Sequence, residues 1–253
     1  MPRFFVPSVN FEGKQVKITG SDAWHIARAL RMAVGEAVTA CDMHGGVHTC
    51  ILRRISDTEV LAEITESVAA AGDPPVRIVL YQALPKGDKM DLIVQKAVEF
   101  GAYAVVPFVS ERCISRPADD ALEKKRVRWQ RIALEAAKQC GRGIVPEVRS
   151  ALSFCSMLER AATAPLVLFC YEGDGTRTLR AVLKEAPPAL FTQDEPSLIS
   201  LVIGCEGGFS ASEAAAARAG GFHMCGLGRR ILRCESASAF ALACISYEYE
   251  LQE

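Results

Sequence analysis

The stretch that decides the fold runs from Leu201 to Ala241 and reads LVIGCEGGFSASEAAAARAGGFHMCGLGRRILRCESASAFA. It opens with an apolar, strand-like run, which a glycine turn and a short helix follow. A second short strand, a second glycine turn and a last helix complete it. Two glycine-rich turns at the ends of nearby strands leave main-chain groups bare, so this pattern predicts one pocket lined by backbone.

The two turns lack the glycine patterns of the common phosphate and hydrolase sites. The P-loop string G-x-x-x-x-G-K-[ST] does not occur in the sequence. A Rossmann fingerprint would need a glycine where Ile231 stands and would lie near the first strand. The nucleophile elbow G-x-S-x-G does not occur either. Apolar walls at Ile203, Leu227 and Leu232 beside bare backbone instead favour a flat purine.

Charged residues flank both turns. Arg229, Arg230 and Arg233 follow the second turn directly and would place permanent positive charge beside the pocket. Such charge suits an anionic substrate or an anion that develops during a reaction. Ser210 and Glu213 match a capping box for the helix that follows the first turn.

The composition is that of a globular protein. The chain has 253 residues, of which 50% are hydrophobic, and a formal net charge of -1, so any basic surface must be local. Its ten cysteines form no C-x-x-C pair. The start MPRFFVPSVN is no secretory leader, and no apolar run reaches the roughly 18 residues of a membrane span. We therefore expect a cytoplasmic protein with free thiols and no membrane partner.

The first seventy residues are rich in strand signals. Runs of β-branched residues between turn signals predict strands at 16–18, 37–41, 47–55 and 60–64. The residues 43–46 predict a hairpin turn between the second and third of these strands. A short helix is expected over 23–32, with Ser21 or Asp22 as its cap. Its expected core face consists of Trp24, Ala27 and Leu30.

One group of residues in this region has metal-ligand chemistry. Cys41, His44, His48 and Cys50 are soft, zinc-type ligands, but their spacing straddles the predicted hairpin. Strand alternation would send some of them to opposite faces, so we interpret them as ordinary hairpin residues and expect no metal. The run AAAGDPP at 69–75 then breaks the pattern and predicts a domain boundary. The predicted domains are residues 1–72 and 73–253.

From Val76 onward, strands alternate with helices. A strand at 76–84, a helix at 90–100 that ends before Gly101, and a strand at 102–109 predict a βαβ unit. The helix should bury Met90, Ile93, Val94, Ala97 and Val98. Further helices are expected at 118–140, 154–162 and 178–184, and further strands at 144–148, 165–172 and 198–204. The basic residues of the 118–140 helix fit either a phosphate-facing patch or a solvated face. The second domain is therefore predicted to be α/β with a mainly parallel sheet.

Two motifs of the opening stretch carry a resemblance to a known family. IGCEGGFSASE (203–213) followed by LGRRILRCESA (227–237) resembles the paired motifs of the SPOUT class of S-adenosylmethionine-dependent RNA methyltransferases. More narrowly, the chain resembles the RsmE family of 16S rRNA uridine-N3 methyltransferases. The likeness includes MPRFF, HIARALR (25–31), the block 86–113 and AAKQCGRGIVPEV (136–148), so it covers nearly the whole chain.

The resemblance implies a fold, a cofactor and partners. The first domain would be a small PUA-like β-barrel that helps to hold rRNA. The second would be a SPOUT domain whose C-terminal part forms a deep trefoil knot, an exception to the general absence of knots. S-adenosylmethionine would bind within the knot. The partners would be 16S rRNA, within the small ribosomal subunit, and a second copy of the chain in a homodimer.

The resemblance also assigns site residues. Arg233 would stabilise negative charge on the uracil, and Glu235 would be either the base or an ordinary helix-start carboxylate. The residues that would surround the cofactor are Phe169, Glu172, Ile203, Gly204, Gly208, Leu227, Gly228, Ile231 and Leu232. Candidate RNA contacts are Arg3, Arg28, Arg31, Lys86 and Arg112, each of which fits a solvated surface charge equally well. Arg28 and Arg31 lie three apart on the expected helix, so both can face a phosphate backbone.

The sequence departs from the family pattern at a few positions. Cys205 stands where the family usually has Pro, and Ser236 stands where Thr is common. Lys138 and Cys140 interrupt a family segment. Two alternatives stay open at this point: a SPOUT enzyme that acts on another RNA or on a ribose hydroxyl, and a non-catalytic RNA-binding or assembly factor that keeps the fold.

Overall fold

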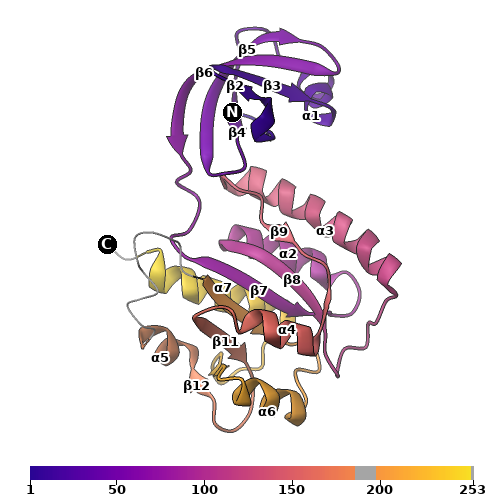
Figure 1. Cartoon of the computed structure of the whole chain (residues 1–253), viewed down its shortest axis with the longest axis vertical. Coiled ribbons are helices and arrows are strands. Elements are labelled where there is room, and N and C mark those ends of the chain that lie inside the picture. Colours follow the sequence, from indigo (N-terminus) through magenta and orange to yellow (C-terminus); the bar gives the residue numbers. More distant parts are fainter. Residues whose placement is uncertain (186–197, 252–253) are drawn as a thin grey trace. The chain divides into compact units, whose positions relative to one another are not determined.

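The chain packs into two compact units in the computed structural model, which describes residues 1–185 and 198–251 (Figure 1). The first unit consists of Met1–Asp73 and Ala137–Val145, and the second of Pro74–Ala136 and Pro146–Glu253. The segment Ala137–Val145 lies far along the sequence from the rest of its unit, so the units differ there from the two consecutive domains expected. The assignment of residues 1–72 to an RNA-binding domain and of 73–253 to a methyltransferase domain stays a prediction.

A six-stranded sheet forms the first unit. Its strands are β1 (Arg3–Phe5), β2 (Phe11–Glu12), β3 (Gln15–Thr19), β4 (Ala37–Cys41), β5 (Gly46–Ile55) and β6 (Glu59–Ala69), with a 3-10 turn at Ser8–Asn10. The order is β1-β4-β5-β6-β3-β2, and every pair is antiparallel except β1 with β4. The four strands expected from the sequence are confirmed.

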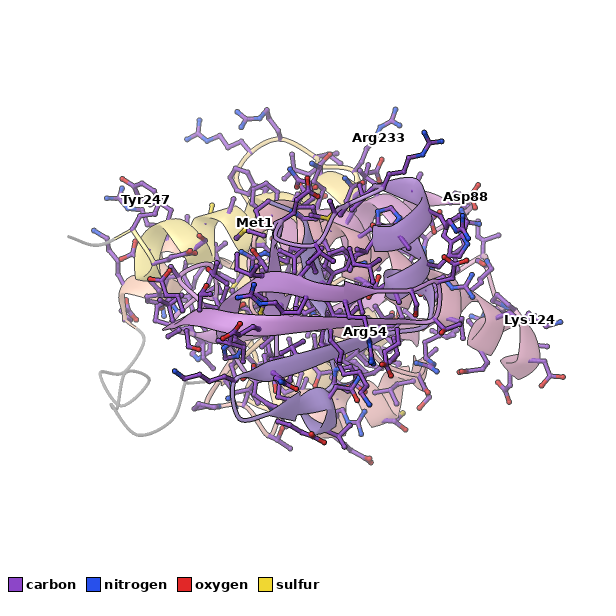
Figure 2. All side chains as sticks on the ribbon, turned by 90° about the horizontal axis from the view of Figure 1, so that it is seen from above. Met1, Arg54, Asp88, Lys124, Arg233 and Tyr247 are labelled. Atoms are coloured by element: carbon purple, nitrogen blue, oxygen red, sulfur yellow. The ribbon has the colours of Figure 1, made fainter. Side chains whose placement is uncertain are left out.

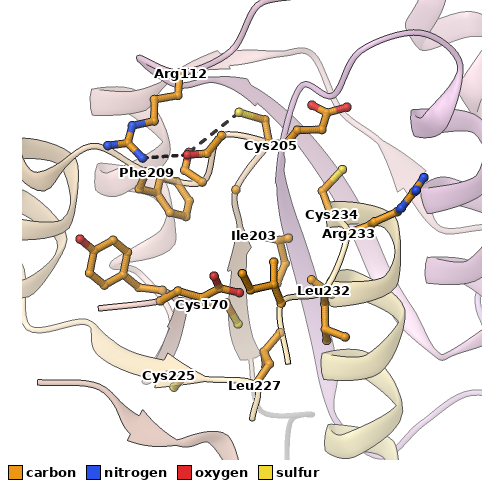
Figure 3. Close-up of a pocket in the computed structure, with 18 of the residues that line it drawn as sticks. Arg112, Cys170, Ile203, Cys205, Phe209, Cys225, Leu227, Leu232, Arg233 and Cys234 are labelled. Carbon is orange, nitrogen blue, oxygen red and sulfur yellow. Dashed lines mark hydrogen bonds between the residues drawn. The ribbon is translucent and has the colours of Figure 1, made fainter. Parts of the chain in front are cut away.

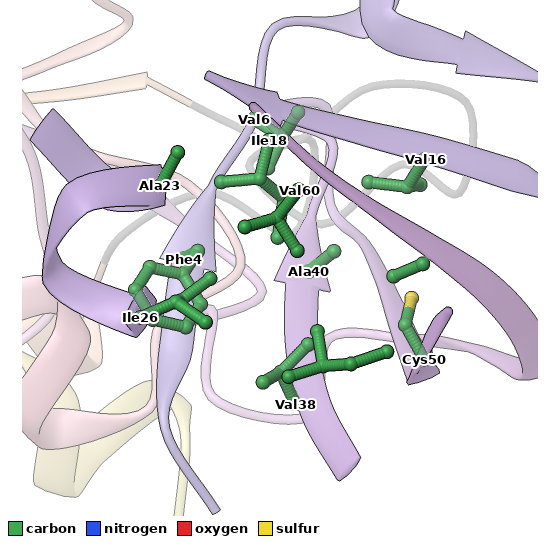
Figure 4. Packing of buried hydrophobic residues seen from close by; sticks show 12 residues of the cluster. Phe4, Val6, Val16, Ile18, Ala23, Ile26, Val38, Ala40, Cys50 and Val60 are labelled. Atoms are coloured by element: carbon green, nitrogen blue, oxygen red, sulfur yellow. The ribbon is translucent and has the colours of Figure 1, made fainter. Parts of the chain in front are cut away.

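Both ends of this sheet contribute to one core. Phe4 of β1 and Val16 of β3 are almost fully buried in the same cluster, and Phe11 of β2 packs against it (Figure 4). β3 alternates, burying Val16 and Ile18 and exposing Gln15, Lys17 and Thr19, as a strand with one face on a core does. The first unit therefore has an apolar interior of its own.

The hairpin turn between β4 and β5 is confirmed. The Asp42 side chain accepts hydrogen bonds from the main-chain N–H groups of His44 and Gly46, both at 2.8 Å. His48 on β5 places Nδ1 2.8 Å from Oγ of Ser67, on the neighbouring strand β6. Within the described ranges, no group of three or more His, Cys, Asp or Glu side chains is placed to hold a metal ion.

The helix expected over 23–32 begins earlier and buries a different face. It consists of α1 (Ser21–Trp24) and a π-helical turn (His25–Ala29), with Gly20 as N-cap and no side-chain cap. Ala23 and Ile26 are buried, whereas Trp24 is 55% exposed and Leu30 is 41% exposed. The expected core positions Trp24 and Leu30 and the expected caps are therefore wrong. The buried face begins at Ala23, one residue before Trp24, so the expected face was out of register before the π turn. That turn holds more residues than an α-helical turn and displaces only the residues after it, such as Leu30.

A parallel sheet forms the centre of the second unit. Its strands are β7 (Arg77–Ala83), β8 (Ala102–Val109), β9 (Glu147–Val148), β10 (Leu152–Ser153), β11 (Leu166–Cys170), β12 (Arg177–Thr178), β13 (Leu198–Ile203) and β14 (His223–Gly226). The order is β10-β8-β7-β13-β11-β14-β12, with β9 beside β8, and each of these described pairs is parallel. The predicted α/β class is confirmed.

Six described helices belong to the α/β part of the chain. They are α2 (Lys89–Glu99), α3 (Asp119–Cys140), α4 (Phe154–Ala161), α5 (Leu179–Lys184), α6 (Ala211–Ala219) and α7 (Cys234–Tyr249). The predicted βαβ unit is confirmed, because β7 and β8 pair in parallel and α2 connects them. All five residues expected on the buried face of α2 are buried, and Gly101 follows its end with φ 84°. No helix of residues 1–185 and 198–251 is long and apolar enough to cross a membrane.

The strand order positions the functional site. β13 lies between β7 and β11, and β14 pairs with β11 rather than with β13, which precedes it in sequence. In parallel strands the carboxyl ends meet at one edge, so the turns after β11, β13 and β14 become neighbours there. The trefoil knot stays a prediction.

Candidate functional site

A cavity of about 730 Å³ lies at this edge of the second unit (Figure 3). Its walls come from the ends of β11 and β13, the turns after β13 and β14, and the start of α7. The lining residues are Lys89, Arg112, Cys170, Tyr171, Glu172, Ile203, Gly204, Cys205, Glu206, Gly207, Gly208, Phe209, Ala211, Cys225, Leu227, Ile231, Leu232, Arg233, Cys234 and Ala237.

The first glycine turn is closely packed backbone. The N–H of Gly208 donates to the carbonyl of Cys205 at 2.9 Å, and Gly208 has φ 64°. A Cβ on Gly204 would lie 3.1 Å from the Cα of Gly208, so a larger residue would push the turn apart. The buried Gln82 side chain donates to the carbonyl of Gly204 at 3.1 Å. These contacts hold bare main chain against the cavity.

Helix α6 begins directly after this turn. Ser210 caps it by accepting the N–H of Glu213 at 3.2 Å, and the Glu213 side chain accepts the N–H of Ser210 at 3.0 Å. The predicted capping box is confirmed. The other oxygen of Glu213 accepts the N–H of Glu111 at 2.8 Å, in the loop after β8. The capping box therefore fixes the first turn to a second loop.

The structure places most of the predicted cofactor residues on the cavity wall. Glu172, Ile203, Gly204, Gly208, Leu227, Ile231 and Leu232 line it. Phe169 does not, because it is fully buried, with its ring 4.2 Å from the ring of the lining residue Phe209. Gly228 lies in the exposed second turn and does not line the cavity.

The two predicted catalytic residues differ in position. Arg233 is exposed, lines the cavity and precedes α7 as its N-cap residue. Its side chain extends at the opposite end of the cavity from Leu227 and Cys225 (Figure 3). Glu235 lies in the first turn of α7 and does not line the cavity; its carboxylate accepts the Cys234 thiol at 3.2 Å.

Glu235 is a weaker base than an ordinary glutamate. Burial raises its pKa, but hydrogen bonds from its own N–H and from Cys234, with the charges of Lys89 and Arg233, outweigh burial. The pKa of Glu235 therefore lies below its usual value. A base role would have to rely on cations that make the substrate proton more acidic.

Four cysteines line the cavity, and sequence reasoning assigned none of them to the site. They are Cys170, Cys205, Cys225 and Cys234. The Sγ of Cys205 lies 3.9 Å from Oγ of Ser110, which also lies 3.2 Å from Sγ of Cys113. A hydrogen bond from Cys113 lowers the pKa of Cys205, although burial opposes it, and the same bond raises the pKa of Cys113. The only sequence feature that set one of these cysteines apart was Cys205, which stands where the family usually has proline.

Sequence reasoning also missed an ion pair on the wall. Nζ of Lys89 lies 2.6 Å from Oε1 of Glu206, and both residues line the cavity. The family-like strings KGDK and GCEGG contained these residues, but they lie 117 positions apart, so only the fold shows the contact.

The predicted RNA contacts fall into two groups. In the second unit, Arg112 lines the cavity and donates to the carbonyl of Gly207 at 2.9 Å, and the N–H of Lys86 donates to Glu206 at 3.1 Å. In the first unit, Arg3 donates to the carbonyl of Arg142 at 3.0 Å and to Cys41 at 3.3 Å, which holds it inside that unit. Also in the first unit, Arg28 pairs with Asp57 at 2.6 Å on the surface, and Arg31 is exposed with φ 52°.

Comparisons with known proteins agree on the family. The model of the RNA methyltransferase domain matches residues 72–246, and that of the RNA methyltransferase PUA domain matches 18–65. The chain is 33% identical to ribosomal RNA small subunit methyltransferase E of Bacillus subtilis, over 99% of this chain and 98% of that protein. It is 34% identical to the Synechocystis enzyme of that name, over 91% of this chain and 72% of that protein.

A solved structure shows the same architecture. Ribosomal RNA small subunit methyltransferase E from Neisseria gonorrhoeae, bound to S-adenosyl methionine, superimposes with a TM-score of 0.82 at 30% identity, over 100% of both chains. The fold therefore consists of a PUA-like sheet and a SPOUT-type α/β domain, as the two motifs implied. The chain belongs to the RsmE family, the ribosomal RNA small subunit methyltransferases E.

Proposed function

We propose that this protein is an S-adenosylmethionine-dependent methyltransferase that methylates N3 of a uridine in 16S rRNA. The observation that carries the proposal is the cavity at the ends of β11, β13 and β14, which has bare backbone and apolar walls and a cation at one end. Family members with the same two domains carry the name of a small-subunit rRNA methyltransferase, and one was solved with S-adenosyl methionine.

The cavity fits the cofactor by its chemistry. Ile203, Leu227 and Leu232 offer apolar surface for a flat purine, and the turn at Gly204 and Gly208 offers main-chain groups for its edge. The turn is packed so closely that a Cβ on Gly204 would meet the main chain of Gly208. A side chain at Gly204 would therefore displace the turn that presents these main-chain groups. When bound, S-adenosylmethionine supplies an electrophilic methyl group.

The protein must activate the uracil nitrogen. Neutral N3–H is a poor nucleophile, because its electron pair is delocalised into the two neighbouring carbonyl groups. A cation fixed near those oxygens stabilises the anion that forms when N3 loses its proton. Arg233 lines the cavity and carries a charge that does not titrate, so it suits this role. Glu235 or a water that it holds would accept the proton, and the low pKa of Glu235 makes this cation essential.

The first unit and a second copy of the chain complete the proposal. The exposed Arg28 and Arg31 support rRNA binding by the PUA-like sheet, since arginines position a phosphate backbone. Homodimer formation is supported by apolar surface on α7, where Phe240 is 41% exposed and Tyr247 is 72% exposed and stands out from the helix (Figure 2). In solution the protein should therefore have twice the mass of the chain.

A transfer assay with three RNAs tests the function. The protein is incubated with S-adenosylmethionine labelled in the methyl group and with assembled small subunits, naked small-subunit rRNA or tRNA. Label should appear in one or both of the small-subunit substrates and not in tRNA. Label only in tRNA would point to a SPOUT enzyme with another substrate. Cofactor binding without label in any RNA would leave a non-catalytic RNA-binding protein.

A further inference from the structure

The ion pair between Lys89 and Glu206 lies on the cavity wall, and the family likeness gave it no role. Lys89 is the first residue of α2, and Glu206 belongs to the first glycine turn. Besides Lys89 Nζ at 2.6 Å, the Glu206 carboxylate accepts the N–H of Lys86, at 3.1 Å for Oε1 and 3.4 Å for Oε2. Glu206 thus fixes both the loop before α2 and the ammonium group of Lys89.

The surroundings keep Lys89 charged and accessible. The hydrogen bond to Glu206 raises the pKa of Lys89; burial lowers it, and the charges of Glu206, Cys234 and Glu235 raise it further. Lys89 lines the same cavity as Arg233 and Cys234, which lie at the start of α7. Its side chain is 33% exposed, and in the described part of the chain its hydrogen bond goes to Glu206. An ammonium has three donors, so two stay available to a ligand.

We propose that Lys89, held by Glu206, is a second cation that contacts the target uracil beside Arg233. The inference rests on the proposed function, because it assigns a further residue to the same reaction. When the N3 proton passes to a base, the electron pair left on N3 spreads onto the two carbonyl oxygens of the ring. Lys89 and Arg233 both line the cavity, so each can stabilise the charge on one of these two oxygens. Lys89 is a catalytic residue in this scheme, and Glu206 is the residue that positions it.

The chain offers a matched control on the same helix. Lys96 of α2 also forms an ion pair, with Nζ 2.6 Å from Oε2 of Glu99, but it does not line the cavity. Lys89→Met should lower kcat about 100-fold, as the loss of one fixed donor to a developing anion does. Lys96→Met should keep the kcat of the unmodified protein. Glu206→Gln should lower kcat less than Lys89→Met, because the amide still accepts from Lys86 and Lys89. Equal kcat for Lys89→Met and Lys96→Met would overturn the inference.

A fluorinated substrate separates a catalytic role from a structural one. rRNA transcribed with 5-fluorouridine has a more acidic N3–H, because fluorine withdraws electrons from the ring. The defect of Lys89→Met should therefore be smaller on this RNA than on ordinary rRNA. A defect of the same size on both RNAs would mean that the lysine only supports the fold. Affinity for S-adenosylmethionine, measured by calorimetry, should be the same for Lys89→Met and the unmodified protein.

A footprint tests the contact without any turnover. The protein is acylated at its lysines alone, with transcribed small-subunit rRNA and with assembled small subunits, and the modified residues are quantified by mass spectrometry. RNA should protect Lys89 and leave Lys96 equally reactive. Equal labelling of Lys89 with and without RNA would contradict the contact. If the unmodified protein transfers no methyl group, the proposed function fails, whereas this footprint still decides whether Lys89 meets RNA.

Discussion

At the scale of single residues, the cations of the cavity carry most of the proposed chemistry. Arg233 and Lys89 line it, whereas Glu235 does not line it and has a lowered pKa. A carboxylate that holds its proton weakly removes a proton well only when that proton is already acidic. The cavity therefore depends on positive charge more than on a strong base. Sequence reasoning reached both Arg233 and Glu235 through the motif LRCES; Arg233 lines the cavity, Glu235 does not, and the role of Glu235 as base stays a prediction.

Removal of the Arg233 charge should separate turnover from cofactor binding. Arg233→Ala should lose about 100-fold or more in kcat, because a fixed charge that stabilises a developing anion contributes that much. Its affinity for S-adenosylmethionine, measured by calorimetry, should stay within a few-fold of the original. Arg230→Ala is the matched control, since Arg230 is exposed in the same loop and does not line the cavity. Unchanged turnover in Arg233→Ala would remove this residue from the mechanism.

The thiol of Cys205 should react at lower pH than an ordinary thiol. The thiolate is the reactive form, and the hydrogen bond from Cys113 lowers the pKa of Cys205, so the thiolate persists to lower pH. The alkylation rate by iodoacetamide should fall only when the pH drops through this lowered value. S-adenosylmethionine should protect Cys205, because the residue lines the cavity.

A variant that lacks the Cys113 thiol tests whether this thiol lowers the pKa of Cys205. Cys113→Ala removes the thiol that donates to Cys205, so the pH at which Cys205 becomes reactive should rise. Mass spectrometry of the Cys205 peptide over a pH series measures both proteins. The same pH dependence in Cys113→Ala and the unmodified protein would show that another group sets the reactivity of Cys205.

At the scale of elements, local signals located most helices and strands, and long-range contacts decided what the signals missed. The buried face of α2 and the cap of α6 follow from residues within one or two turns, so the sequence predicted them correctly. The buried face of the helical segment at 21–29 consists of Ala23 and Ile26, one residue before the expected positions, and no residue spacing indicated the π turn at His25–Ala29. The helix expected at 178–184 corresponds to α5, and residues 186–197, which follow it, lie outside the described residues.

The capping box of α6 should contribute more stability than a simple cap. Glu213 is 6% exposed and accepts two main-chain N–H groups, from Ser210 and Glu111. Glu213→Ala should therefore lower the free energy of unfolding by about 3 kcal/mol, because two main-chain donors, the buried Ser210 N–H and the Glu111 N–H, lose their partner. Ser153→Ala removes the side-chain cap of α4, which accepts one N–H at 3.1 Å in an exposed position. That loss should be about 1 kcal/mol.

Chemical denaturation of the two variants compares them directly. Glu213→Ala should also weaken cofactor binding, since α6 continues the glycine turn that lines the cavity. Ser153→Ala should leave that binding unchanged. A loss of stability no larger in Glu213→Ala than in Ser153→Ala would mean that the contact with Glu111 contributes nothing.

At the scale of the whole molecule, sequence patterns predicted the class of each unit but not the path of the chain between them. The segment Ala137–Val145 belongs to the first unit, although it follows the βαβ part of the second. Arg142, which is 3% exposed, forms an ion pair with Asp73, and the N–H of Gly143 donates to Asp73 at 3.1 Å. These partners lie 69 and 70 positions apart, so no local pattern shows the contact.

The candidate site is a property of the same long-range order. The motifs at 203–213 and 227–237 showed two glycine turns, and their position at the ends of nearby strands predicted one pocket. The strand order β7-β13-β11-β14 brings the turns together and adds Lys89 and Arg112 from elsewhere in the chain. Sequence reasoning thus reached most of the motif residues, together with Glu172 and Arg112, but it missed Lys89, which the fold brings to the wall.

The position of the transferred methyl group tests the central claim most directly. The protein is incubated with small subunits and S-adenosylmethionine that carries a deuterated methyl group, and the rRNA is digested to nucleosides for mass spectrometry. The account predicts a deuterated methyl group on N3 of one uridine in 16S rRNA. A deuterated methyl group on a carbon or a ribose oxygen, or none at all while the cofactor binds, would contradict it.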